Sequence, residues 1–178
     1  MKQRDILVRV CLAAYLYLLV KIILFKGGSI DNHSYMMWQL QESLNHPAEI
    51  LMKMKRGNLI PLHEIRRTLH DMTSHGLVNL IGNIAIFMPF GLLVGMLGSQ
   101  RRLTVFAAAA ISCALSLLLE LSEAVLSIGS FDVDDIILNT IGGLAGFTLY
   151  WMYTIVLGHG ERPVRRNAEQ VTPPGQIC

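Results

Sequence analysis

The chain has 178 residues, of which 52% are hydrophobic and 16% are charged, and its mean hydropathy is +0.45. This composition is more apolar than that of a typical soluble domain, so it indicates an integral membrane protein. The net charge of +2 is small and gives no sign of a nucleic-acid partner. Cys11 and Cys113 lie inside apolar runs and Cys178 is the last residue, so no pair is placed for an extracytoplasmic disulfide.

Four segments reach the length of about 20 residues that a helix needs to span a bilayer. They lie near residues 6–25, 77–97, 103–123 and 136–157. In the first, Arg9 and Lys21 lie near the ends, where long basic side chains can reach the lipid headgroups. A cleaved signal peptide is the alternative for this segment. Its apolar run is longer than a usual signal h-region, so we favour an uncleaved N-terminal anchor over residues 1–25.

The first predicted loop, residues 26–76, contains helical patterns of its own. Residues 34–44 include Tyr35 and Trp38, and aromatic side chains of this kind favour the membrane interface. A second helical stretch follows Pro47 and covers about 48–56. Residues 57–61 read as an extended piece that leads into a short amphipathic helix, with Pro61 near its start.

Basic residues in the short connections predict the orientation. They follow the second and fourth apolar segments, whereas the connection between the third and fourth has none; the residues are Arg101, Arg102, Arg162, Arg165 and Arg166. Because basic residues remain on the cytoplasmic side, both termini are expected there, and the 26–76 loop is expected outside. The predicted fold class is therefore an all-α integral membrane protein with four transmembrane helices and a cytoplasmic, disordered tail over 158–178.

Carboxylates and amides gather at the ends of three spans that this topology places in one membrane leaflet. Within each span most of them lie three or four residues apart and so share one helix face, and Asp134 lies next to such a face. The residues are Asn79, Asn83, Glu120, Glu123, Asp132, Asp134, Asp135 and Asn139. We expect these stripes to line one outward-facing cavity.

Helix capping is the alternative explanation for part of this cluster. Asp132 suits the N-cap of the fourth span and Asp135 its third helical position, where negative charge is favourable. Capping does not explain Glu120 and Glu123, because they lie at the C-terminal end of a helix.

Small residues predict close packing between the second and fourth spans. Gly91 and Gly95 form one small-xxx-small pair, and Gly142 and Gly146 form another. Such pairs let two membrane helices approach closely.

Several separated strings resemble the VanZ-like membrane proteins in order and spacing. They are GNLIP at 57–61, NLIGNIAIFMPFG at 79–91, Glu120-x-x-Glu123, FDVDD at 131–135 and NTIGG at 139–143. The resemblance covers about 100 residues and leaves out the N-terminal anchor, the loop over 26–56 and the tail. It implies a three-helix core over 77–157, a place in the bacterial cytoplasmic membrane, and a further polar site residue, Asn58.

The family is associated with low-level resistance to teicoplanin, a lipoglycopeptide, and many of its members have no assigned role. Two positions depart from the family pattern, since Gln is common at the place of Glu123 and Arg at that of Gly129. The cluster is thus more acidic than in relatives and needs cations from elsewhere. Arg66 or Arg67, a cationic ligand, or a divalent metal held by Asp132, Asp134 and Asp135 remain alternatives, and no other cofactor is expected.

Our leading hypothesis is a membrane protein that engages a lipoglycopeptide or a lipid-linked cell-wall precursor in the outer leaflet. The acyl tail would lie between helices while Asp and Asn side chains hold the polar head. The competing hypothesis is an enzyme acting on a lipid headgroup, with Asp134 or Asp135 as metal ligand and Glu120 as general acid or base. It lacks an evident nucleophile, because Ser122, Ser127 and Ser130 have no adjacent histidine. A third alternative is a helical scaffold whose acids only cap and pack.

Overall fold

A computed structural model describes residues 3–24, 33–98 and 103–157, and almost all of them are helical. The helices are α1 (Gln3–Leu24), α2 (His33–Asn45), α3 (Pro47–Arg56), α4 (His63–Asp71), α5 (Ser74–Gly98), α6 (Val105–Leu126) and α7 (Val133–Leu157). Four of them are long and apolar enough to cross a membrane, over Gln3–Ile23, Ser74–Gly98, Val105–Leu126 and Val133–Val156. The predicted all-α class with four spans is confirmed.

The helices predicted in the first loop are also present. α2 begins at His33, α3 begins at Pro47, and α4 begins two residues after Pro61. The arginines that predicted the orientation and the predicted tail over 158–178 lie outside the described residues. The assignment of the two membrane faces therefore stays a prediction.

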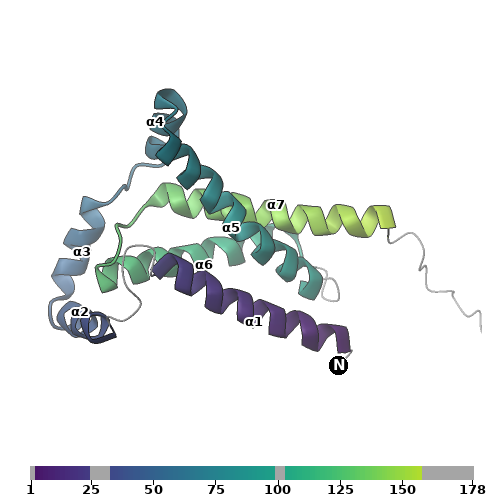
Figure 1. Ribbon diagram of the computed structural model, residues 1–178, viewed down its shortest axis with the longest axis horizontal. Helices are drawn as coiled ribbons and strands as arrows, with labels where there is room; N and C mark the ends of the chain where they lie inside the picture. Colours follow the sequence, from purple (N-terminus) through teal and green to yellow (C-terminus); the bar gives the residue numbers. More distant parts are fainter. Residues whose placement is uncertain (1–2, 25–32, 99–102, 158–178) are drawn as a thin grey trace, which may run out of the picture.

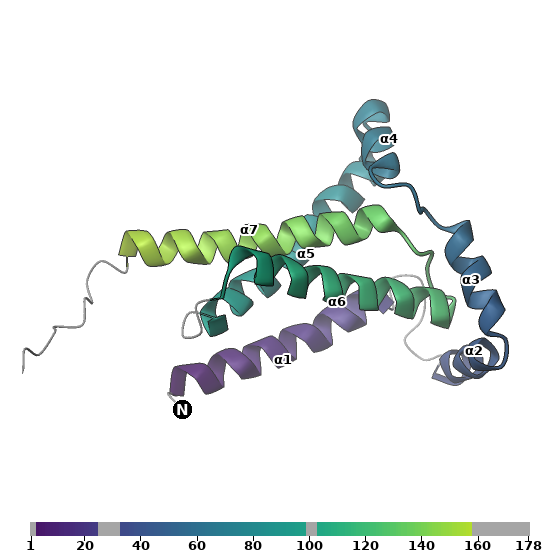
Figure 2. The same ribbon diagram turned by 180° about the vertical axis from the view of Figure 1, so that it is seen from behind.

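The four long helices run alongside one another, and α2, α3 and α4 gather at one end of them (Figures 1 and 2). We call this the α2–α4 end; α1 and α6 finish there, and α5 and α7 start there. α2 is fixed to it by the Ser43 hydroxyl, which donates a hydrogen bond of 2.6 Å to the carbonyl of Val125 in α6. The same end thus collects the polar ends of three spans, as the sequence predicted.

Glycine lets α5 and α7 pack backbone against backbone. A Cβ atom at Gly91 would overlap the carbonyl of Gly143, and one at Gly146 would overlap the carbonyl of Met88. Gly95 instead lies against the ring of Tyr150. The predicted close approach of these two spans is confirmed, since only small residues permit it.

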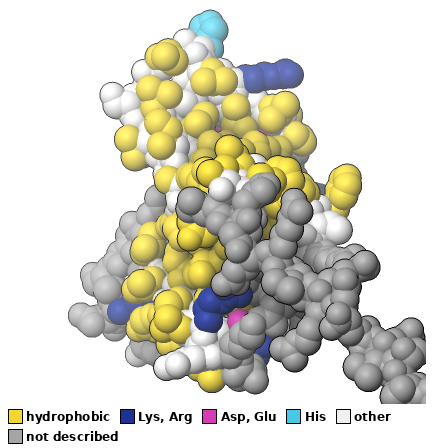
Figure 3. Space-filling model, turned by 90° about the vertical axis from the view of Figure 1, so that its right-hand side faces the viewer, with side chains coloured by type: hydrophobic (Ala, Val, Ile, Leu, Met, Phe, Trp, Pro, Cys, Tyr) yellow, Lys and Arg dark blue, Asp and Glu magenta, His cyan; other side chains and the backbone are white. Residues whose placement is uncertain are grey.

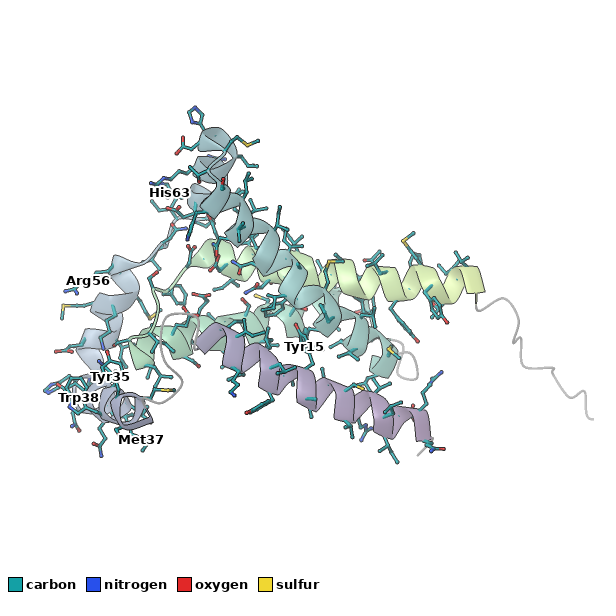
Figure 4. All side chains as sticks on the ribbon, viewed as in Figure 1. Tyr15, Tyr35, Met37, Trp38, Arg56 and His63 are labelled. Carbon is teal, nitrogen blue, oxygen red and sulfur yellow. The ribbon has the colours of Figure 1, made fainter. Side chains whose placement is uncertain are left out.

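α1 packs onto the bundle through an apolar cluster. Leu19 of α1, Phe87 and Phe90 of α5 and Leu119 of α6 are buried against one another. The Tyr15 hydroxyl of α1 donates a hydrogen bond to the carbonyl of Ile86, within the contact between α1 and α5 (Figure 4). The N-terminal helix is therefore part of the helical bundle.

The outer surface of the long helices is apolar, as a lipid-facing surface must be. Large hydrophobic side chains such as Val78, Phe106 and Val156 are exposed on the spans. Seen from the end opposite α2–α4, hydrophobic side chains cover much of the described surface, and basic side chains appear in few places (Figure 3). On α2, Tyr35 and Trp38 are exposed together, which fits the interfacial placement predicted for this helix (Figure 4).

Candidate functional site

The GNLIP and FDVDD strings pair directly with each other. The Asn58 amide donates to the carbonyl of Phe131 at 2.9 Å, and the Val133 amide donates to the carbonyl of Asn58 at 3.0 Å. These bonds form a parallel bridge between Asn58 and Asp132. Gly57 is needed beside it, because a Cβ atom there would overlap the carbonyl of Phe131. The extended piece at 57–61 was predicted, but its partner was not.

Asp132 is part of this bridge and is also the N-cap residue of α7. Its Oδ1 accepts a hydrogen bond of 2.9 Å from the side-chain amide of Asn58 and one of 2.8 Å from the backbone amide of Asp134. The second bond is an N-cap, so the capping interpretation of Asp132 is confirmed. Loss of hydration on burial is the largest influence on this carboxyl and raises its pKa above the ordinary value, outweighing the bonds from Asp134 and Asn58.

Asp134 caps a different helix from the one that carries it. The side chain is 1% exposed, and its two oxygens accept the backbone amides of Leu62 and Ile65 at the start of α4. Leu62 precedes α4 with a left-handed φ of 66° and supplies no side-chain cap. A carboxylate is favourable here because amides without helical partners converge at a helix N-terminus. The sequence offered one signal, the lack of a capping residue before His63.

Glu120 lies at the C-terminal end of α6, but its carboxylate is used at the start of α7. It is 4% exposed, and Oε2 accepts the backbone amide of Asp132 at 2.9 Å. The hydrogen bond from the Asp132 amide thus explains why an acid occurs near the C-terminal end of α6, where the helix dipole disfavours negative charge. We use the name polar junction for Asn58, Glu120, Asp132 and Asp134, which together join α4, α6 and α7.

The two departures from the family pattern lie side by side. A Cβ atom at Gly129 would overlap the carboxylate of Glu123. A residue larger than glycine at position 129 therefore requires Glu123 to move. Arg67, one of the cations considered for the acids, pairs instead with Glu64 at 3.6 Å and Asp71 at 3.9 Å.

The remaining predicted residues form two separate contacts. The side-chain amide of Asn83 donates to Asp135 Oδ1, and that of Asn79 lies 3.5 Å from the same oxygen, which links α5 to α7. Asn139 lies deeper, where its side-chain amide donates to the Ser116 hydroxyl at 2.9 Å. The structure thus divides the predicted cluster among a polar junction, an α5–α7 link and a buried α6–α7 bond.

The carboxylates of Asp134 and Asp135 border very little open space. The cavity that they line has a volume of 20 Å³, about the space for one water molecule. Within the described ranges, no three His, Cys, Asp or Glu side chains are grouped so that they could hold a metal ion. Ser122, one of the nucleophiles considered, donates its hydroxyl to the carbonyl of Leu118 in its own helix at 2.7 Å.

A much larger cavity lies between α3, α4 and the start of α5. This α3–α4 cavity has a volume of 610 Å³. Its charged and titratable lining residues are Lys55, Arg56, His63, Glu64, His75 and Asp132, and Asn58, Asn79, Thr68 and Ser130 add polar groups. Neither Lys55 nor Arg56 was predicted from the sequence to belong to the site, although both directly precede GNLIP.

A second space, the α1–α5 groove, lies between the end of α1 and the first half of α5. It has a volume of 280 Å³, and its lining is mostly apolar: Ile22, Ile23, His75, Val78, Asn79, Gly82, Asn83 and Ile86. His75 and Asn79 line both spaces. A polar cavity and a mostly apolar groove thus share two lining residues in the first part of α5.

Four apolar spans indicate a multi-pass membrane protein, and the polar cavity at one end of them is its candidate site. The family model for VanZ/LLP1 matches residues 12–156, so the chain belongs to the VanZ/LLP1 family. The chain is also similar to Protein VanZ of Enterococcus faecium, with 29% identity over 147 residues, which cover 82% of this chain and 74% of that protein. No solved structure matches the chain significantly. The family match includes most of α1 and all of 26–56, which corrects the expectation that both fall outside the resemblance.

Proposed function

We propose that this protein binds a lipid-linked envelope molecule from the outer leaflet of the bacterial cytoplasmic membrane and thereby contributes to low-level protection against lipoglycopeptides such as teicoplanin. The observation that carries the proposal is the shared boundary of the α3–α4 cavity and the α1–α5 groove at His75 and Asn79. A lipid has the matching form, because a polar head continues into an apolar tail.

The proposed orientation places the α2–α4 end outside the cell and both termini in the cytoplasm. It rests on the arginines at 101, 102, 162, 165 and 166, since basic connections remain on the cytoplasmic side. The exposed aromatic residues of α2 would then lie at the outer interface, at the same end of the spans as the cavity. A ligand could enter from the outer leaflet without crossing the membrane.

We assign the acyl chain to the groove and the head to the cavity. Ile22 and Ile23 of α1 face Val78 and Ile86 of α5 across the groove, and these side chains offer only apolar contact. Asn58 and Asn79 line the cavity and can donate hydrogen bonds to a polar head. The carboxylates first expected to bind the head instead support the cavity wall, because Asp134 caps α4 and Asp132 holds Asn58.

Filling the groove tests the proposal. Nothing lies within 4 Å of a Cβ atom placed at Gly82, so Gly82→Leu would extend into the groove without a clash at its base. In a susceptible Gram-positive host, we expect the wild type to raise the inhibitory concentration of teicoplanin more than that of vancomycin. Gly82→Leu should abolish this difference at matched membrane abundance.

Ala85→Leu is the matched control, because Ala85 is exposed on the same helix and does not line the groove. It should protect as the wild type does. Equal protection by Gly82→Leu and Ala85→Leu would contradict the groove assignment.

A further inference from the structure

We propose that the head bound in the α3–α4 cavity carries a phosphate group, so that the ligand is an anionic phospholipid or a lipid-linked phosphate. This inference rests on the proposed function and names the ligand class. It reverses the charge expected from the sequence, which placed acidic side chains around the head.

Lys55 and Arg56 carry the two permanent positive charges of the cavity wall. Neither makes an ion pair with any of the residues that the structure describes. His63 and His75 add two imidazole groups that can donate hydrogen bonds. An anion would give Lys55 and Arg56 a charged partner, whereas a neutral head would leave both charges unpaired.

The two acids of the wall already have partners. Glu64 Oε1 lies 3.2 Å from His63 Nδ1 and 3.6 Å from Arg67 Nη1. Asp132 Oδ1 accepts hydrogen bonds from Asn58 and from the first turn of α7. Neither carboxylate therefore forms an ion pair with Lys55 or Arg56, and these two bases remain available to an anion.

The position of the cavity fits a phosphate. Arg56 ends α3 and His63 begins α4, on either side of the short segment that connects them (Figure 4). Leu59 and Ile60 in that segment are exposed, which suits the depth of the headgroups rather than open water. Lysine and arginine are the side chains that most often hold phosphate, through short charge-assisted hydrogen bonds.

Binding of defined lipids to the purified full chain in detergent tests the proposal. Dioleoyl phosphatidic acid and dioleoylglycerol have the same acyl chains and differ by the phosphate. We expect phosphatidic acid to bind about tenfold more tightly or better, because charge-assisted bonds to a phosphate add to the apolar contact. Lys55→Gln/Arg56→Gln should remove this advantage and leave diacylglycerol binding unchanged.

Lys53→Gln/Arg66→Gln is the matched control, because it removes the same charge from α3 and α4 at positions that do not line the cavity. It should bind phosphatidic acid as the wild type does. Equal affinity for the two lipids, or equal losses in the two double variants, would overturn the phosphate assignment. Inorganic phosphate that binds as tightly as phosphatidic acid would also overturn it, because the ligand would then be a free anion.

The same data separate this inference from the proposed function. Suppose that diacylglycerol binds, that Gly82→Leu abolishes this binding, and that the phosphate gives no gain in affinity. The groove proposal then stands, and the phosphate assignment fails. Where neither lipid binds the wild type, both fail.

Discussion

The polar junction and the wall of the α3–α4 cavity lie side by side, yet they use charge in opposite ways. In the junction, buried carboxylates accept hydrogen bonds from the chain itself: Glu120 from the Asp132 amide, and Asp134 from two amides of α4. On the wall, Lys55 and Arg56 are exposed and make no ion pair with any described residue. The clustered acids thus hold the fold together, while the less conspicuous bases remain available to a ligand.

The two regions are also connected. Asp134 fixes the start of α4, and α4 carries His63 and Glu64 into the cavity wall. Asn58 and Asp132 belong to the junction and line the cavity as well. Loss of a junction residue should therefore lower stability first and ligand binding as a consequence. Loss of a residue that belongs to the wall alone, such as Lys55 or Arg56, should lower binding only.

Asp134→Ala should give the largest loss of stability. It leaves the amides of Leu62 and Ile65 without their acceptor, and we expect a cost of about 2–4 kcal/mol in the free energy of unfolding. Thermal unfolding in detergent and abundance in membranes would measure it. Asp71→Ala, an exposed acid at the other end of α4, is the control and should cost about 0–1 kcal/mol. Equal losses would mean that Asp134 does not hold α4.

Gly57→Ala should give the next largest effect. The new methyl group would overlap the carbonyl of Phe131 and push the GNLIP segment away from α7, at a cost of about 1–3 kcal/mol. Gly82→Ala is the control, because nothing lies within 4 Å of its Cβ position, and it should be neutral or stabilising. Thermal unfolding of both variants decides between the two outcomes. A neutral Gly57→Ala would show that the bridge is loose, which would remove the distinction between junction and wall.

The elements were predictable because their signals are local. Apolar runs of spanning length gave four helices, and Pro47 gave the start of α3. The four-residue spacing of Asn79 and Asn83 gave the polar face of α5, although its contact with Asp135 of α7 was not predicted. Asp132 as the cap of α7 also follows from its place directly before the apolar run. Each of these depends on residues within a few positions of one another.

The site was only partly predictable, because its decisive contacts are remote in sequence. Asp134 accepts a hydrogen bond from Leu62 at the start of α4, and the two residues are 72 positions apart in the sequence. No spacing rule connects them. Because the carboxylates of the junction bind the chain itself, Lys55 and Arg56 are left as the available charged residues of the open cavity. They belong to a helix that mixes polar and apolar residues, and this pattern gives no sign of a cavity. A cluster of charged residues in a sequence marks a place where burying charge costs free energy. The groups that offset this cost can be backbone amides, as they are for Asp134.

Asp132 allows the smallest and most specific test of the junction. Burial raises the pKa of this carboxyl, so its ionisation costs stability in the folded state. For an acid with a raised pKa, the folded state binds the proton more tightly than the unfolded state. Stability should therefore increase as the pH falls through the raised pKa toward the ordinary value near 3.8.

Asp132→Asn keeps an oxygen that can accept from Asn58 and from the Asp134 amide, but it cannot ionise. We expect the unfolding temperature of the wild type to rise relative to that of the variant between neutral pH and pH 4. A constant difference between wild type and Asp132→Asn across this range would mean that Asp132 is not desolvated, and the junction would then be as open to water as the cavity wall.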